Sequence, residues 1–149
     1  MGLVEWFNNQ KIIPFGRLLS FYPPFFLLGA KVRISEDYLK IRLRLPIRWY
    51  IKNNNGVMFG GAISMLSDPF PAIVFEKIFN NISAWTKGMQ VKYLMPAKTT
   101  IEANIVISDE DIEFLENQLK ETGKAEKTFN YYFLDKKTDR SLMFQIPSI

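Results

Sequence analysis

The chain has 149 residues, of which 48% are hydrophobic and 15% aromatic, enough to bury the core of one domain. It contains no cysteine and no histidine, which excludes disulfides, thiolate nucleophiles, serine–histidine triads and metal sites built on those ligands. Its net charge of +4 is spread along the chain without a basic block and so does not indicate a nucleic-acid partner.

The N-terminal part predicts short helices. Its first residues, MGLVEWFNNQK, lack the order of a signal peptide, and no run of ~18 apolar residues follows, so we expect no membrane span and a cytoplasmic location. Apolar spacing over Leu3–Ser20 predicts two helical pieces divided by Pro14. The run Phe21–Gly29 is interpreted as core rather than as the lining of an apolar ligand site. We expect one domain, 1–149, on which a helical segment, 1–28, packs.

Two strands are predicted next. Lys31–Ser35 is a short candidate, and Tyr38–Pro46 alternates clearly between apolar residues and a row of cations, Lys40, Arg42 and Arg44. Such a row could bind phosphates, but it is more typical of the solvated face of an antiparallel sheet. No aromatic residue interleaves it, so we expect no nucleic-acid binding there.

A nearly all-apolar stretch, about residues 59–79, predicts a long buried helix that is too short to span a membrane. The single ionised side chain in its first half is Asp68, which shares a face with Met65 and several small residues. We therefore expect a buried carboxylate with room beside it, and a kink at Pro69. The alternative is a solvent-facing aspartate that favours the helix dipole.

Four further strands follow, in two pairs separated by a short helix. The alternating segments are Trp85–Met95, Thr100–Ser108, Lys127–Asp135 and Leu142–Ile146. A serine cap and acidic first turn predict the inserted helix near 109–121. This order fits an α+β fold in which a single antiparallel sheet curls around one central helix.

That architecture resembles the hotdog fold, and particular residues carry the resemblance. Asn53, the triplet Phe59-Gly60-Gly61 and Asp68 are similar to the asparagine, His-Gly-Gly and helix carboxylate of hotdog thioesterases of the phenylacetate-pathway type. The segment QVKYLMPA, residues 90–97, resembles a strand that those enzymes end with Pro-Ala. The segments YPPF, LPIRWY and FGG followed by SDPF resemble DUF4442, a bacterial family of unknown function in the same superfamily.

The resemblance implies hydrolysis of an acyl-CoA or acyl-carrier-protein thioester by a homodimer or tetramer, with coenzyme A only as part of the substrate and no metal or bound cofactor. The matched positions would place Gly60 at the oxyanion and Asp68 as base or nucleophile. Asn53 would hold the loop or the carbonyl, and Thr86 would position water. In hotdog dimers the glycine and the acid of one site usually come from opposite subunits.

Four more residues would bind substrate by the same resemblance: Phe59, Gly61, Ser64 and Met65. Phe59 stands where many relatives have histidine, so the imidazole's role is absent here, and hydratase or dehydratase chemistry, which needs that histidine, is discarded. The pocket would then suit a long apolar acyl chain. The alternative is a non-catalytic acyl-binding or sensing protein with the same fold.

Overall fold

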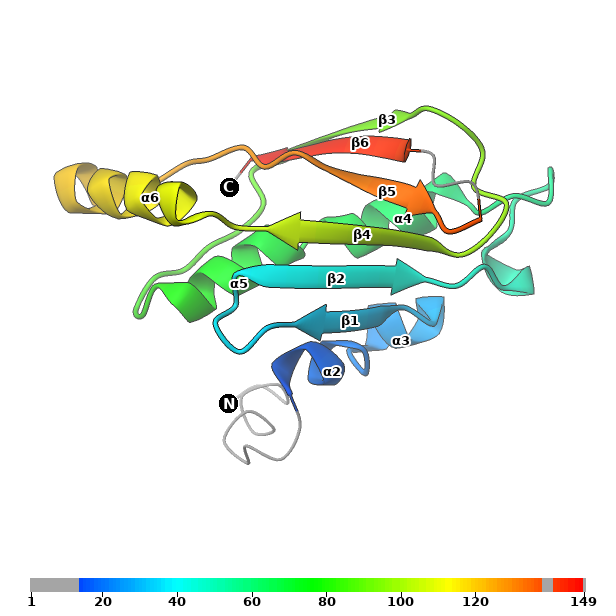
Figure 1. Ribbon diagram of the computed structural model, residues 1–149, viewed down its shortest axis with the longest axis horizontal. Coiled ribbons are helices and arrows are strands. Elements are labelled where there is room, and N and C mark those ends of the chain that lie inside the picture. The colour runs from blue at the N-terminus through cyan, green and yellow to red at the C-terminus, as the bar shows by residue number, and fades with distance from the viewer. Residues whose placement is uncertain (1–13, 138–140, 149) are drawn as a thin grey trace.

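The computed structural model of the protein describes residues 14–137 and 141–148, and the helix expected before Pro14 lies outside these ranges (Figure 1). All six strands belong to one antiparallel sheet in the order β1-β2-β4-β5-β6-β3. The strands are β1 (Lys31–Ile34), β2 (Lys40–Leu45), β3 (Gly88–Tyr93), β4 (Ile101–Val106), β5 (Tyr131–Asp135) and β6 (Ser141–Ser148). The six predicted strands are confirmed, except that the third begins at Gly88 rather than at Trp85 and the fifth at Tyr131 rather than at Lys127.

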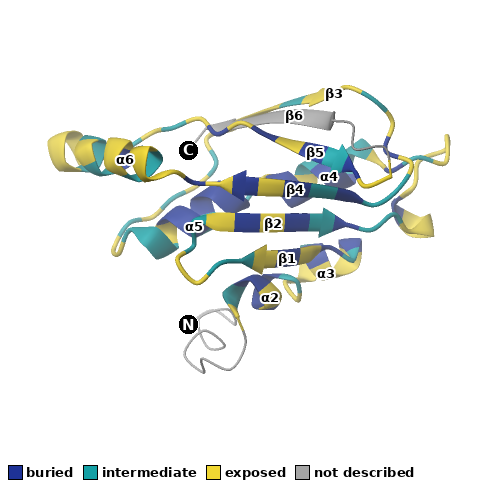
Figure 2. Ribbon diagram, in the orientation of Figure 1, coloured by how far each residue is buried: buried dark blue, intermediate teal, exposed yellow. Residues whose placement is uncertain are grey.

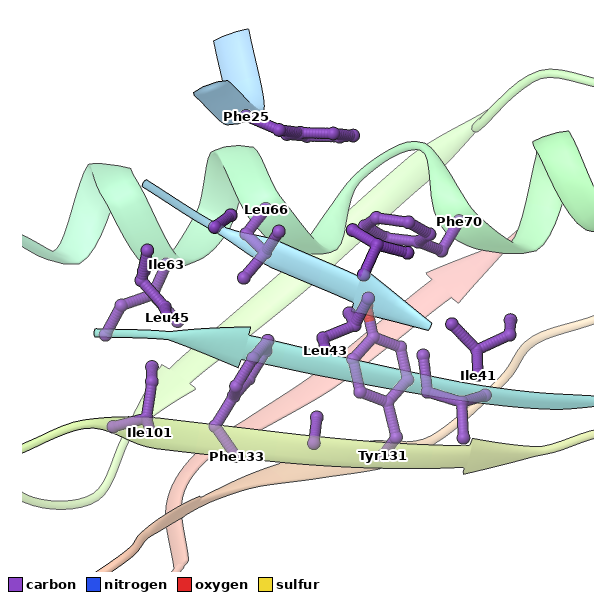
Figure 3. Packing of buried hydrophobic residues seen from close by; sticks show 14 of the residues in the cluster. Phe25, Ile41, Leu43, Leu45, Ile63, Leu66, Phe70, Ile101, Tyr131 and Phe133 are labelled. Atoms are coloured by element: carbon purple, nitrogen blue, oxygen red, sulfur yellow. The ribbon is translucent and has the colours of Figure 1, made fainter. Parts of the chain in front are cut away.

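Two consecutive helices, α4 (Gly60–Ser67) and α5 (Phe70–Ile78), lie across one face of this sheet (Figure 1). The inward-facing residues of β2, β4 and β5 are buried as their alternation predicts, and the outward-facing ones are mostly exposed (Figure 2). Phe70 of α5 stacks on Phe25 with ring centroids 5.3 Å apart (Figure 3). The predicted α+β arrangement, a sheet around a central helix, is confirmed.

The central helix is broken where its prolines fall. Pro69 and Pro71 have no N–H, so the carbonyls of Met65 and Ser67 lose the donors that a continuous helix would supply four residues later. The Tyr131 hydroxyl of β5 donates to the Ser67 carbonyl instead, at 2.8 Å. The kink expected at Pro69 is thus confirmed as a break between α4 and α5.

The N-terminal helices α2 (Phe15–Leu19) and α3 (Pro23–Leu28) lie beside β1 (Figure 1). Phe25 and Leu28 of α3 join the core, whereas Phe26 and Leu27 are exposed, so the apolar run is core on one side only. The inserted helix α6 (Asp109–Thr122) begins with the expected cap, because Ser108 and Asp111 exchange side-chain and backbone hydrogen bonds. Gly123, with φ of 70°, ends it.

The outer face of the sheet carries the cation row of β2. Arg42 and Arg44 both pair with Glu102 of β4, at 2.7 and 3.3 Å, and Lys136 joins them at 3.1 Å. Burial disfavours the charged form of Glu102, but the hydrogen bonds from Arg42 and Lys136 outweigh it and lower the pKa of this carboxyl. The two arginines are therefore engaged within the sheet.

Candidate active site

The start of α4 presents backbone N–H groups beside two glycines. Phe59 precedes the helix with an extended backbone, and the first N–H groups of a helix have no acceptor within it. A Cβ atom at Gly60 would come within 2.9 Å of the Tyr93 ring, and one at Gly61 would collide with the Phe59 ring. Aromatic rings thus pack directly against the backbone at both positions, and a larger residue at either would displace the far end of one of these side chains.

Ser64 and Tyr93 form a polar pair one turn into α4. The Ser64 hydroxyl lies 2.8 Å from the Tyr93 hydroxyl and 3.2 Å from the Gly60 carbonyl, to which it donates. Tyr93 is the last residue of β3, so this pair ties the end of that strand to the first turn of α4. The structure thus brings Phe59, Gly60, Gly61 and Ser64 together, as predicted, and adds Tyr93.

Asp68 lies at the break between the two helices. It is the C-cap of α4 and precedes Pro69, the N-cap of α5, so the two helix dipoles act on its carboxylate in opposite directions. Asp68 and Met65 are exposed. The buried position expected for this carboxylate is therefore wrong for the single chain, because α4 turns this side outward and only its opposite side packs on the sheet.

Thr86 lies beside Asp68. Its hydroxyl donates to the main-chain carbonyl of Asp68 at 2.8 Å. This hydrogen bond uses the hydroxyl proton of Thr86. The lone pairs of the hydroxyl oxygen can still accept a hydrogen bond from water. Thr86 therefore fixes the backbone of Asp68 and remains able to orient a water molecule next to its carboxylate.

Tyr131 stabilises the break between α4 and α5, next to Asp68, from inside the sheet. Its ring is buried and its hydroxyl reaches the Ser67 carbonyl, one residue before Asp68 (Figure 3). Burial raises the pKa of Tyr131 well above its ordinary value in spite of that hydrogen bond, and the negative charge of Asp68 raises it further. The hydroxyl consequently stays protonated and keeps donating, which holds the helix break in one geometry.

Asn53 lies apart from both groups. Its side-chain oxygen accepts from the backbone N–H of Asn55 at 3.0 Å and of Val57 at 3.3 Å, and Gly56 closes the turn with a φ of 73°. The turn is joined to the N-cap of α4, since the N–H of Phe59 donates to the Ile51 carbonyl. Of the two roles considered for Asn53, this geometry supports holding the loop.

Gly60 and Asp68 are eight residues apart, which corresponds to roughly 12 Å along the helix. Between and around them, several large apolar side chains are exposed on α4, β3 and the segment that precedes β3: Phe59 (57%), Met65 (50%), Trp85 (69%), Met89 (38%) and Tyr93 (51%). We call these five residues the α4–β3 face. An exposed apolar surface of this kind is typical of an interaction site.

Tyr93 and Tyr131 are the two residues of this region that the sequence did not point to. The motif match ended at the helix carboxylate and the Pro-Ala strand end, and neither tyrosine differs in its pattern from an ordinary strand residue. The signal that would have identified Tyr131 is Pro71. Because proline has no N–H, the Ser67 carbonyl four residues earlier needs another donor.

No helix in residues 14–137 or 141–148 has the length and apolar character needed to cross a membrane. Within the same described ranges, no cluster of three acidic side chains is placed to hold a metal ion.

The sheet wrapped around α4 and α5, with a glycine pair opening the helix, defines the hotdog class of protein. Solved structures share this fold. The chain is similar to PA5026 from Pseudomonas aeruginosa, a protein of unknown function that also carries the description "Probable Thioesterase", with a TM-score of 0.76, 23% identity and coverage of 89% of each chain. It is similar to the thioesterase HI1161 from Haemophilus influenzae, with a TM-score of 0.66, 12% identity, and coverage of 89% of this chain and 84% of that one.

A third similar structure is the Escherichia coli PaaI protein from the phenylacetic acid degradation operon, with a TM-score of 0.65, 12% identity, and coverage of 97% of this chain and 91% of that one. No curated protein matches the sequence. A family model does match: residues 14–146 fit "Domain of unknown function (DUF4442)", and the protein belongs to that family. The family resemblance and the hotdog fold predicted from the sequence are both confirmed.

Proposed function

We propose that this protein hydrolyses thioesters of acyl groups with coenzyme A or an acyl carrier protein. The observation that carries the proposal is the presence of a glycine helix start at Gly60 and an exposed carboxylate at Asp68 along the same helix. The descriptions of PA5026 and HI1161 as thioesterases support the same chemistry. Coenzyme A enters only as part of the substrate, and the scheme uses no metal or bound cofactor.

In the proposed reaction the N–H of Gly60 donates to the thioester carbonyl oxygen and stabilises the negative charge that develops on it. Asp68 accepts a proton from the water that attacks the carbonyl carbon. The tetrahedral intermediate then expels the thiolate as the C–S bond breaks, and the thiolate takes the proton from Asp68, which leaves a carboxylic acid and a free thiol. If Asp68 attacks the carbon directly, a mixed anhydride forms, which water then hydrolyses to the same products.

The proposed site is shared between two copies of the chain. With roughly 12 Å between Gly60 and Asp68, one protomer cannot place both groups on the same carbonyl. A second copy packed on the α4–β3 face would bury its exposed apolar side chains. A two-fold arrangement would also set Gly60 of one copy near Asp68 of the other. A homodimer is the smallest assembly that meets this requirement, and a tetramer of two such dimers meets it as well.

One observation favours a second function, acyl binding without turnover. The rings of Phe59 and Tyr93 pack against the two glycines, and Phe59 occupies the position at which the thioesterase motif has histidine. A site of this kind could retain an acyl-CoA without activating its carbonyl. This alternative predicts tight retention of the ligand and no release of free thiol.

The test replaces Asp68 with asparagine, which keeps the shape and removes the proton acceptor. We expect kcat for acyl-CoA hydrolysis to fall by about 10²-fold or more with little change in KM. Release of thiol from a series of acyl-CoA substrates measures turnover, and the melting temperature measures stability. Asp109→Asn is the matched control, because Asp109 lies in the first turn of α6 and its removal reports the effect of a helix dipole alone, about 0.3–1 kcal/mol.

An Asp68→Asn variant that keeps wild-type turnover would remove Asp68 from the mechanism, whether or not its melting temperature changes. Wild-type protein that releases no thiol while retaining acyl-CoA through purification would instead establish the binding alternative.

A further inference from the structure

A large cavity is lined by residues of α5 and α6, two helices that lie at the same end of the molecule (Figure 1). Its volume is about 820 Å³. It is walled by the last turns of α5, the segment of residues 79–87 and the second half of α6 with the residues that follow it. We call it the α5–α6 cavity. The cavity is open to solvent on one side, and its volume is in the range of ligand sites.

The inner wall of the α5–α6 cavity is apolar. It includes Phe75, Phe79, Ile82, Leu115 and Leu119, of which Phe75 and Leu115 are buried. Phe75 stacks on Phe79 with centroids 6.1 Å apart, which fixes both rings of the wall. A wall made of rings and branched aliphatic side chains favours a hydrocarbon group over a charged or strongly hydrated one.

Charged and polar groups lie on another part of the lining, and some of them are paired with each other. Lys87 and Glu126 form an ion pair at 2.5 Å, and the Gln118 side chain accepts from the backbone N–H of Glu126 at 2.9 Å. Both members of the ion pair are more than half exposed, so they lie toward solvent. Trp85, also largely exposed, lines the cavity as well. One side of the α5–α6 cavity is therefore apolar, and the other is polar and faces solvent.

Three consecutive residues connect the lining of the cavity to Asp68. Trp85 and Lys87 line the cavity, and Thr86 between them bonds the carbonyl of Asp68. Phe75 lies seven residues beyond Asp68, which puts the inner wall roughly 10 Å further along the helices. A flexible acyl chain can span that distance from a carbonyl held at Asp68, whereas an acyl group of only a few carbons cannot.

We infer that the α5–α6 cavity binds the aliphatic chain of the acyl group, with the thioester carbonyl at Asp68 and the chain running past Thr86 to Phe75 and Leu119. This assignment rests on the proposed thioester site and adds to it a substrate class, medium to long acyl groups. The bulk of the chain lies against the apolar wall, and the polar side of the cavity stays hydrated.

The test fills the cavity. Leu119→Trp adds volume to the wall, and Asn117→Trp, an exposed position on the same helix outside the cavity, is the matched control. Binding is measured with cis-parinaric acid, a fluorescent fatty acid, so that the assignment can be judged without turnover. Hydrolysis is measured with butanoyl-CoA and dodecanoyl-CoA. Ala125→Phe, which fills the same cavity from the residues after α6, serves if Leu119→Trp fails to fold.

We expect Leu119→Trp to weaken cis-parinarate binding by at least about tenfold, and to raise KM for dodecanoyl-CoA while leaving butanoyl-CoA unchanged. Asn117→Trp should change neither. If the wild-type protein hydrolyses no thioester but Leu119→Trp still abolishes cis-parinarate binding, the proposed function is refuted and the cavity assignment is supported. Unchanged binding and an unchanged chain-length profile would overturn the assignment. So would a shift in oligomeric state at constant cis-parinarate affinity, because the cavity would then be a contact between copies.

Discussion

The two edge strands of the sheet, β1 and β3, meet different surroundings. Along β1, helix α2 approaches so closely that a Cβ atom on Gly16 would lie 2.5 Å from the backbone nitrogen of Ile34. The Ser20 hydroxyl, just after α2, accepts from the N–H of Val32 at 2.9 Å. A helix and a side-chain acceptor thus cover this edge with residues of the chain itself, which is one way in which proteins protect a sheet edge.

Along β3 no further strand follows among the described residues, and its side chains are exposed on both faces of the sheet apart from the half-buried Val91. The neighbouring α4–β3 face adds exposed aromatic and methionine side chains. Two residues that attach β3 and its leading segment to the helices are Tyr93 and Thr86. They contact Gly60, Ser64 and Asp68, which belong to the candidate site.

The two edges differ in the property that we expect changes there to affect. The β1 edge is closed by contacts that a single chain supplies, so changes there should affect stability. The β3 edge carries the candidate site and an apolar surface that a single chain leaves exposed. We therefore expect changes on β3 to affect assembly and activity with little effect on the fold of the protomer.

The largest effect is expected from a charge on β3. Met89→Lys would place an ammonium group in the proposed contact between copies, where an unpaired buried charge costs about 3–5 kcal/mol. The dimer should dissociate at concentrations at which the wild type stays assembled, and turnover per protomer should fall by about 10²-fold or more. Sedimentation velocity and thiol release on the same samples measure both effects.

Val106→Lys is the control for that experiment, since Val106 is an exposed apolar residue at the end of β4, away from the β3 edge. It should leave assembly and turnover unchanged. A Met89→Lys protein that remains a dimer with full activity would show that the β3 edge is not the contact.

A smaller effect, confined to stability, is expected at the closed edge. Gly16→Ala would gain up to about 1 kcal/mol in helix propensity, but its new methyl group meets backbone that cannot rotate away. We expect the free energy of unfolding to drop by about 1–3 kcal/mol, with assembly and turnover unchanged once the protein is folded. Urea denaturation measures the free energy of unfolding, and Arg17→Ala, at the exposed neighbouring position, is the control. Equal stability of the two variants would mean that α2 does not close this edge tightly.

Much of the fold could be predicted because burial on one face imposes a period on the sequence. The alternation in β2 and β4 specified their inward faces, and Pro69 specified the break in the central helix. The limits of β3 were predicted less well, since Trp85 and Thr86 continue the alternation but lie outside the sheet, where the Thr86 hydroxyl bonds the Asp68 carbonyl. Alternation alone does not show which partner a residue meets.

The candidate site was predictable only where spacing along one helix decides it. Phe59, Gly60, Gly61 and Ser64 lie together because they are neighbours at the start of α4. Tyr93 bonds Ser64, which is 29 residues away in the sequence. Tyr131 bonds Ser67, which is 64 residues away. The exposure of Asp68 also depended on which side of α4 packs on the sheet, a tertiary choice that a helix with apolar residues on most sides does not reveal.

The central claim, a site composed of Gly60 from one copy and Asp68 from the other, is tested most directly by mixing two inactive proteins. Asp68→Asn removes the carboxylate. Gly60→Pro removes the N–H at the first position of α4, where proline is tolerated and where Phe59 already has the extended backbone that precedes proline. The nearest atoms to a Cβ at this position belong to the flexible end of the Tyr93 side chain.

Each variant alone should be inactive as a homodimer. After the two are unfolded together, refolded at equal concentration and assayed for thiol release, random pairing should restore about one quarter of wild-type activity, because half the dimers are mixed and each holds one intact site. A site contained within a single protomer predicts no recovery at any mixing ratio, and that result would contradict the account.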